Sequence, residues 1–315
     1  MKLDPRTWIT DLRKVKLTGW RRTAAYAFFF VLAFTLALRL TFPVAAVKER
    51  LLLDAAAQGY QITVNDLSPS GLLGIRAREV IVVTSDGARI PIEQLTVGIR
   101  ILPSLIGRKA YSFDASIFGG TVTGSTEASK TAERYQVRLE GVDLARAGVV
   151  RAATGLELGG ILSGKLDVNL DPKDPQKSTG TIDFQVKDGA IRGGTVPVPG
   201  MDGGITVPPV KLGAITVRGA LKNGRADFAT LEAKGDEMNI VADQVFVQLQ
   251  PKLAFSPMSG RLKLRPTDSF WRKEQVAPLK PIIEMGLASA KSPDGGYGFQ
   301  IFGTLNKPQT RPSSF

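Results

Sequence analysis

The chain has 315 residues, enough for one large or two ordinary domains. Of these residues 43% are hydrophobic and 22% are charged, a composition typical of folded proteins. It contains neither cysteine nor histidine, which excludes disulfides, thiolate metal sites and most zinc and triad chemistry. Residues 1–22 carry seven cations against two carboxylates, so +5 of the net charge of +12 is concentrated there and the remaining +7 is dispersed over the rest of the chain. We interpret this basicity as a membrane signal and expect no nucleic-acid partner.

The segment 23–47 is apolar apart from Arg39. As a helix it would extend about 37 Å, enough to cross a hydrocarbon core of about 30 Å. We therefore expect a cytoplasmic basic leader over 1–22, a single transmembrane helix over 23–47 and a periplasmic β-rich domain over 48–315, with the orientation given by the positive-inside rule. A signal peptide cleaved near "PVAA" (43–46) is the alternative.

Beyond this segment, "AVKERLLLDAAAQGY" (46–60) predicts a short helix, and the period then changes from helical to two. Strands are predicted in "QITVNDL", "REVIVV", "ARIPIEQLTVGIRIL", "YQVRLEGV", "GKLDVNLD", "GTIDFQVKDGAIRGG" and "GYGFQIFGTL". The pairs Asp188–Gly189 and Asn223–Gly224 favour tight hairpin turns. The sequence thus predicts a mainly β, elongated antiparallel body, built as an open curved sheet, half-barrel or sandwich, with one or two short helices.

The stretch "SFDASIFGGTVTGS" (112–125) shows the repeated unit of strand, glycine turn and strand. Apolar residues alternate with polar ones, so each strand has one apolar side. We expect this side to face lipid or a partner, or to form a closed core. The candidate positions are Phe113, Ile117, Leu166, Phe184 and Phe299.

Two segments interrupt this pattern. The proline-rich and glycine-rich stretch 195–213 favours an extended loop or an edge passing over the sheet. The stretch 268–291 predicts a short helix, broken between Pro278 and Pro281, that packs on the sheet.

No residue is nominated for catalysis, for a cofactor or for a metal. Gly159, Gly164 and Lys165 have the spacing of a phosphate-binding loop, but Leu166 follows the lysine and an alternating strand replaces the expected helix. Carboxylates such as Asp167 are best explained as solvent-facing strand residues. We therefore predict that the protein is not an enzyme.

The chain resembles protein N of the bacterial type II secretion system in "GYQITVNDLSPSGLLGIRAREVIVV" and "ILPSLIGRKAYSFDASIFGGTVTGS". The similarity continues in "VPPVKLGAITVRGALKNGRADF", "KGDEMNIVADQVFVQL", "LKLRPTDSF" and "DGGYGFQIFGTL". Its strand and glycine-pair units are also similar to those of AsmA-type envelope proteins. The resemblance implies an inner-membrane protein of Gram-negative bacteria with a periplasmic β body, and it implies no catalytic residues.

Three functions remain open. The first is a non-enzymatic accessory subunit of type II secretion that contacts other components of that apparatus. The second is an AsmA-like module that binds or transfers phospholipid along the apolar side of its sheet. The third and weakest is a carboxylate-dependent hydrolase acting on envelope glycans, which would need two carboxyl groups within about 10 Å in a cleft.

Overall fold

The computed structural model describes residues 24, 26, 28–30, 33, 48, 49, 52, 53, 56, 61–71, 74–83, 89–100, 107–129, 131–148, 151, 155–198 and 201–315. The chain divides into two compact units, Met1–Val47 and Lys48–Phe315. The second unit contains the β structure.

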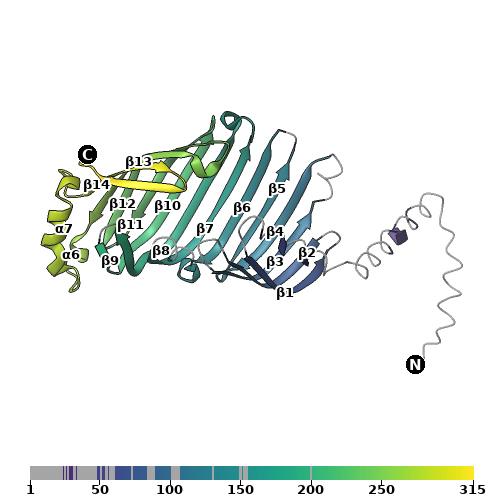
Figure 1. Ribbon diagram of the computed structural model, residues 1–315, viewed down its shortest axis with the longest axis horizontal. Coiled ribbons are helices and arrows are strands. Elements are labelled where there is room, and N and C mark those ends of the chain that lie inside the picture. The colour runs from purple at the N-terminus through teal and green to yellow at the C-terminus, as the bar shows by residue number, and fades with distance from the viewer. Residues whose placement is uncertain are drawn as a thin grey trace, which may run out of the picture. The chain divides into compact units, whose positions relative to one another are not determined.

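The strands described in this unit form a single antiparallel sheet of 15 strands in which each strand pairs with the next along the chain (Figure 1). The exception is β9, which pairs only with β8, so that β10 takes the next place in the sheet. The strands are β1 (Gln61–Ser70), β2 (Gly74–Val83), β3 (Arg89–Ile99), β4 (Lys109–Ile117), β5 (Gly120–Ala128), β6 (Glu133–Asp143), β7 (Leu156–Leu170), β8 (Thr179–Val198), β9 (Met201–Val207), β10 (Val210–Lys222), β11 (Arg225–Lys234), β12 (Met238–Gln248), β13 (Pro257–Pro266), β14 (Tyr297–Thr304) and β15 (Lys307–Pro312).

The register of these strands divides the side chains between two chemically different faces. Directly paired residues of an antiparallel sheet lie on the same side, and successive residues of a strand lie on opposite sides. One row of pairs runs through Val97, Phe113, Gly124, Val137, Leu166 and Ile182. The neighbouring row runs through Thr96, Asp114, Thr123, Arg138, Lys165 and Asp183. We call the sides that carry these rows the apolar face and the polar face.

The turns explain how so long a meander stays in register. Asn223 and Gly224, with φ of 49° and 70°, form the tight turn predicted between β10 and β11. The turn between β4 and β5 is formed by Phe118 and Gly119, with φ of 52° and 75°, while Gly120 already belongs to β5. Two consecutive left-handed residues match the twist of a two-residue hairpin.

The turn predicted at Asp188–Gly189 is wrong. The strand β8 continues through these residues, and its register with β7 and β10 shifts there. Asp188 does have the positive φ (52°) that the sequence indicates. That φ serves a β-bulge, which also needs a left-handed residue and increases the local twist.

The stretch 195–213, predicted as an extended loop or an edge passing over the sheet, is largely strand. The end of β8, all of β9 and the start of β10 occupy most of it. Because β9 pairs with β8 alone, the prolines lie in a peripheral ribbon, where a missing N–H interrupts no central ladder.

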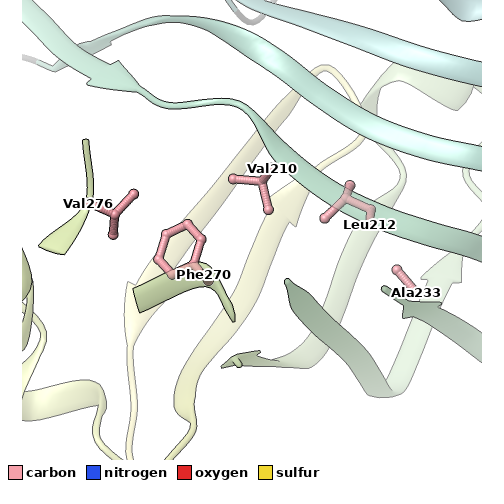
Figure 2. Packing of buried hydrophobic residues seen from close by; sticks show 5 residues of the cluster. All are labelled: Val210, Leu212, Ala233, Phe270 and Val276. Atoms are coloured by element: carbon pink, nitrogen blue, oxygen red, sulfur yellow. The ribbon is translucent and has the colours of Figure 1, made fainter. Parts of the chain in front are cut away.

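The predicted helical segment is present as short pieces, α6 (Asp268–Trp271), η4 (Ala277–Leu279), α7 (Lys280–Gly286) and η5 (Ala288–Ala290). Three further 3-10 turns are η1 (Leu144–Arg146), η2 (Pro175–Lys177) and η3 (Leu253–Phe255). Phe270 and Val276 pack against Val210 and Leu212 on β10 and Ala233 on β11 (Figure 2). The segment therefore packs on the sheet, as predicted, through a cluster that includes fully buried Val276.

The mainly β, antiparallel character and the short helices are confirmed, but the membrane-spanning helix predicted over 23–47 is not supported and that part of the fold class is wrong. Among the described residues, no helix is long and apolar enough to cross a membrane. A span needs about 20 consecutive apolar helical residues. The described positions between 23 and 47 are Ala24, Tyr26, Phe28–Phe30 and Ala33, and these are helical. The other residues of the predicted span, the leader over 1–22 and much of the helix predicted over 46–60 lie outside the described residues.

Candidate functional site

The structure places all five candidate positions on the apolar face, although they come from strands far apart in the sequence. Phe113 and Ile117 lie on β4, Leu166 on β7, Phe184 on β8 and Phe299 on β14. Phe113 pairs with Val97, Leu166 with Ile182 and Phe299 with Leu262. All five are half-buried. The five side chains therefore belong to one continuous apolar surface.

Two of these phenylalanines lie over a glycine of the neighbouring strand. A Cβ atom added to Gly124 would be 2.5 Å from Cζ of Phe113, and one added to Gly164 would collide with Cδ1 of Phe184. A third pair repeats the arrangement more loosely, since a Cβ on Gly219 would lie 3.0 Å from Cδ1 of Phe228 on the next strand. The rings thus occupy the space that a side chain at these glycines would fill.

At these three places a single ring covers two neighbouring strand positions, so the apolar face protrudes less from the backbone of the sheet. A ring that covers a glycine shields the backbone of the neighbouring strand and takes the place of a second side chain. Sequence analysis singled out Phe113 and Phe184 but did not predict their contacts with Gly124 and Gly164, nor the contact of Phe228 with Gly219. The sequence feature that could have indicated these contacts is a glycine at an apolar position of one strand's alternating pattern, directly opposite an aromatic residue of the neighbouring strand.

Short segments cover parts of the apolar face. Near one set of strand ends, Ala147 after η1 packs with Phe118 and Val142 and with half-buried Ile117. Nearer the C-terminus, α6 and Val276 cover the ends of β10 and β11. Among the described residues, the elements in close contact are neighbouring strands and these short helices, and no second sheet stacks on the first.

A third cluster lies toward the opposite ends of the strands. Its buried members are Leu221, Ala226 and Val247. Half-buried Leu249 and Met258 pack against them, at the connection from β12 to β13. The apolar face therefore extends to the turns at this end of the sheet.

The polar face is hollowed where it crosses β3 to β7. The hollow has a volume of about 730 Å³. Its lining consists of polar side chains and, between them, the backbone of residues whose side chains lie on the apolar face. The polar side chains include Ser112, Asp114, Thr123, Ser125, Gln136 and Lys165. Asp167, at its margin, accepts hydrogen bonds from Nη2 of Arg134 (2.8 Å) and Nε2 of Gln136 (2.9 Å). The hydrogen bond from Arg134 holds the pKa of Asp167 below its ordinary value.

The carboxylates of this hollow are not placed as a hydrolytic pair. Asp114 is on β4 and Asp167 on β7, three strands away, which separates them by about 14 Å across the sheet. Two catalytic carboxyl groups of a glycosidase lie within about 10 Å of each other. Lys165 lies within β7 and not at the start of a helix, so the phosphate-binding interpretation rejected from the sequence has no structural support either. Within the described part of the chain, no group of three carboxylates is arranged to hold a metal ion.

No known family model, no curated protein and no solved structure matches this chain. The resemblance to secretion protein N and to AsmA-type proteins stays a prediction.

Proposed function

We propose that the apolar face binds the acyl chains of phospholipids or similar amphiphiles. The observation that carries this proposal is the continuity of the face, since apolar residues occupy the same side of successive strands from β1 to β14. Val64, Val80 and Ile92 form one of its rows near the start, and Leu264 pairs with Tyr297 near its end.

The free-energy cost of leaving an apolar sheet face in water supports acyl chains as its cover. Exposed apolar patches on soluble proteins rarely exceed a few hundred Å², because each Å² of apolar surface left in water costs about 25 cal/mol. One face of an antiparallel sheet normally packs on a core of helices or a second sheet. In the described residues that cover is short and lies near the strand ends, so the strand centres around Phe113, Leu166 and Phe184 are left for a ligand.

The chemistry of the face suits acyl chains better than a compact polar ligand. Aliphatic side chains and phenylalanine rings offer dispersion contacts along a line of strands without a demand for specific hydrogen bonds. Most polar side chains of the central strands, among them Asp114, Arg138 and Lys165, lie on the opposite face, where they could meet solvent.

Photocrosslinking compares the two faces directly. A benzoylphenylalanine is placed at Phe184 in the full chain, and a control at Gln185, the next residue, which lies on the polar face. We expect phospholipid adducts, identified by mass spectrometry, at position 184 and a several-fold lower yield at 185. Equal yields at both positions, or no adduct at 184, would refute the proposal.

The predicted role as an accessory subunit of type II secretion stays a separate proposal, motivated by the resemblance. Crosslinking in intact cells should recover components of that apparatus, and deletion should impair secretion. Recovery of none, together with normal secretion, would contradict it. The predicted inner-membrane and periplasmic location is tested by fractionating the same cells.

A further inference from the structure

Two joined turns at one end of the sheet expose large apolar side chains to solvent. The first contains η3, between β12 and β13, and the second connects β14 to β15. Leu253 is 47% exposed, Phe255 57% and Leu305 45%. We call these three residues the apolar tip.

The apolar tip is held by hydrogen bonds between the two turns. The amide of Leu305 donates to the carbonyl of Ser256 (3.0 Å), and the amide of Asn306 donates to the carbonyl of Ala254 (3.0 Å). Ser256 is fully buried, and its Oγ accepts from the amide of Gln250 (3.0 Å). Because these hydrogen bonds fix the backbone of both turns, the fold itself holds the three side chains of the tip in exposed positions.

The tip continues the apolar face. Leu249 precedes η3 and Met258 follows it, and both pack in the cluster of Leu221, Ala226 and Val247. An apolar surface thus leads from the strand centres to the end of the sheet and ends in the exposed side chains of the tip.

The charge around the tip is positive. Lys252 and Lys307 flank it, and residues 248–258 and 303–309 contain no carboxylate. The neighbouring turn adds Lys222, and its Gly224 carbonyl accepts a hydrogen bond from the amide of Leu249 (2.7 Å).

We propose that the apolar tip inserts into the surface of a bilayer that carries anionic headgroups. Exposed leucine and phenylalanine beside lysine is the composition of interfacial anchors, in which the apolar groups enter the acyl boundary and the ammonium groups meet phosphates. Three side chains are too few for a protein interface, which needs about 800 Å² from each partner, but they suffice for a bilayer, which demands no shape complementarity. The inference rests on the proposed function, because it gives the lipid-binding face a place to exchange lipid with a membrane.

The absence of cysteine allows a single fluorophore to report on the tip. The variant Ala254→Cys places an NBD group in η3, and Asp236→Cys places it before the start of β12, about 35 Å away along that strand. Both labelled full-length chains are mixed with phosphatidylcholine vesicles containing 0 or about 30% phosphatidylglycerol, a fraction that brings the surface potential into the range of anionic membranes. Quenching by lipids that carry a spin label in the acyl chain measures insertion.

We expect a blue shift and acyl-chain quenching at position 254 with the anionic vesicles, and no change at position 236. The added substitutions Leu253→Ser and Phe255→Ser should abolish the response, and Lys252→Glu with Lys307→Glu should abolish its dependence on phosphatidylglycerol. Equal responses at both positions, no response at 254, or a change at 254 that follows protein concentration without vesicles would overturn the proposal. Lipid adducts at Phe184 with a silent tip would refute membrane insertion alone, whereas a responding tip without adducts would refute the lipid-binding face alone.

Discussion

At the scale of single residues, the contact of Phe113 with Gly124 makes the apolar face sensitive to one methyl group. We expect Gly124→Ala to lower the free energy of unfolding by about 1–3 kcal/mol, because the new Cβ meets the phenyl ring at 2.5 Å and the Gln136 carbonyl oxygen at 2.6 Å. Gly98→Ala is the matched control, since its Cβ would meet only Ser112 Oγ at 3.6 Å. Urea denaturation measures both, and equal losses would contradict the account.

A second residue-scale feature fixes the helical segment to the sheet. Glu237 is 8% exposed and accepts hydrogen bonds from Nζ of Lys273 (2.6 Å) and from the amide of Lys211 (2.8 Å). Nζ of Lys273 also donates to the carbonyl of Pro209 (2.6 Å). A single carboxylate thus joins the turn before β12, the start of β10 and the residues after α6.

We expect Glu237→Gln to lower the free energy of unfolding at pH 7 by about 2 kcal/mol, because charge-assisted hydrogen bonds become neutral ones. Glu274→Gln is the control, since Glu274 is exposed in the same segment. Denaturation curves of the two variants check this, and equal effects would argue against a fixing role for Glu237.

This loss should depend on pH. Burial alone would raise the pKa of Glu237, but the hydrogen bonds from Lys273 and Lys211 outweigh it and hold the pKa below its ordinary value of 4.5. A depressed pKa in the folded state adds stability that is complete above the ordinary pKa and is lost as the pH falls through the folded one. The difference between wild type and Glu237→Gln should therefore shrink between pH 7 and pH 3. A difference that stays constant over this range would show that the carboxylate charge is not responsible.

At the scale of elements, the last strand ends the sheet in a way that discourages further pairing. In the hairpin closed by Thr304 and Lys307, Pro308 and Pro312 occupy positions whose backbone faces away from β14. Proline has no N–H, so Thr310 is left as the outward donor between them. Edge strands with proline and exposed charge resist association.

We therefore expect the double variant Pro308→Thr and Pro312→Thr to self-associate more than wild type, because it restores a continuous row of donors at the edge. Sedimentation velocity over a concentration series measures this. Pro293→Thr, in an exposed turn, is the control. Unchanged sedimentation of the double variant would show that the prolines do not protect the edge.

The elements also show what the sequence could and could not predict. Alternation placed Phe113, Leu166 and Phe184 correctly on the apolar side of their strands, because successive side chains of any extended strand point to opposite sides. Asp188–Gly189 and Asn223–Gly224 look alike in sequence, yet one forms a bulge and the other a turn. A positive φ serves both, and the choice depends on the partner strands, which lie elsewhere in the chain.

The candidate site was predictable in its residues but not in its extent. The five positions were identified without knowledge of which strands are neighbours. The contacts of Phe113 and Phe184 with glycines depend on register, which single-strand periodicity does not determine. The apolar tip was likewise beyond the sequence, because Phe255 and Leu305 come together only through hydrogen bonds between two turns.

At the scale of the whole body from Lys48 to Phe315, one sheet replaces the usual pair of packed layers. Consecutive strands pair along nearly the entire meander, and the direction of the strands changes markedly between the middle of the sheet and β14 (Figure 1). Each added strand contributes backbone hydrogen bonds to such a sheet. The apolar face of the sheet, however, is buried only where another element or a ligand covers it.

Native mass spectrometry of the purified full-length chain tests this central claim most directly. We predict that wild type retains bound phospholipid, and that Phe113→Gln with Leu166→Gln and Phe184→Gln keeps the far-ultraviolet circular dichroism of a β protein but loses most of that lipid. Polar residues should be tolerated at these half-buried positions if the face is open. A wild-type chain that carries no lipid would contradict the account. A triple variant that unfolds would also contradict it, because unfolding is the result expected for a closed core.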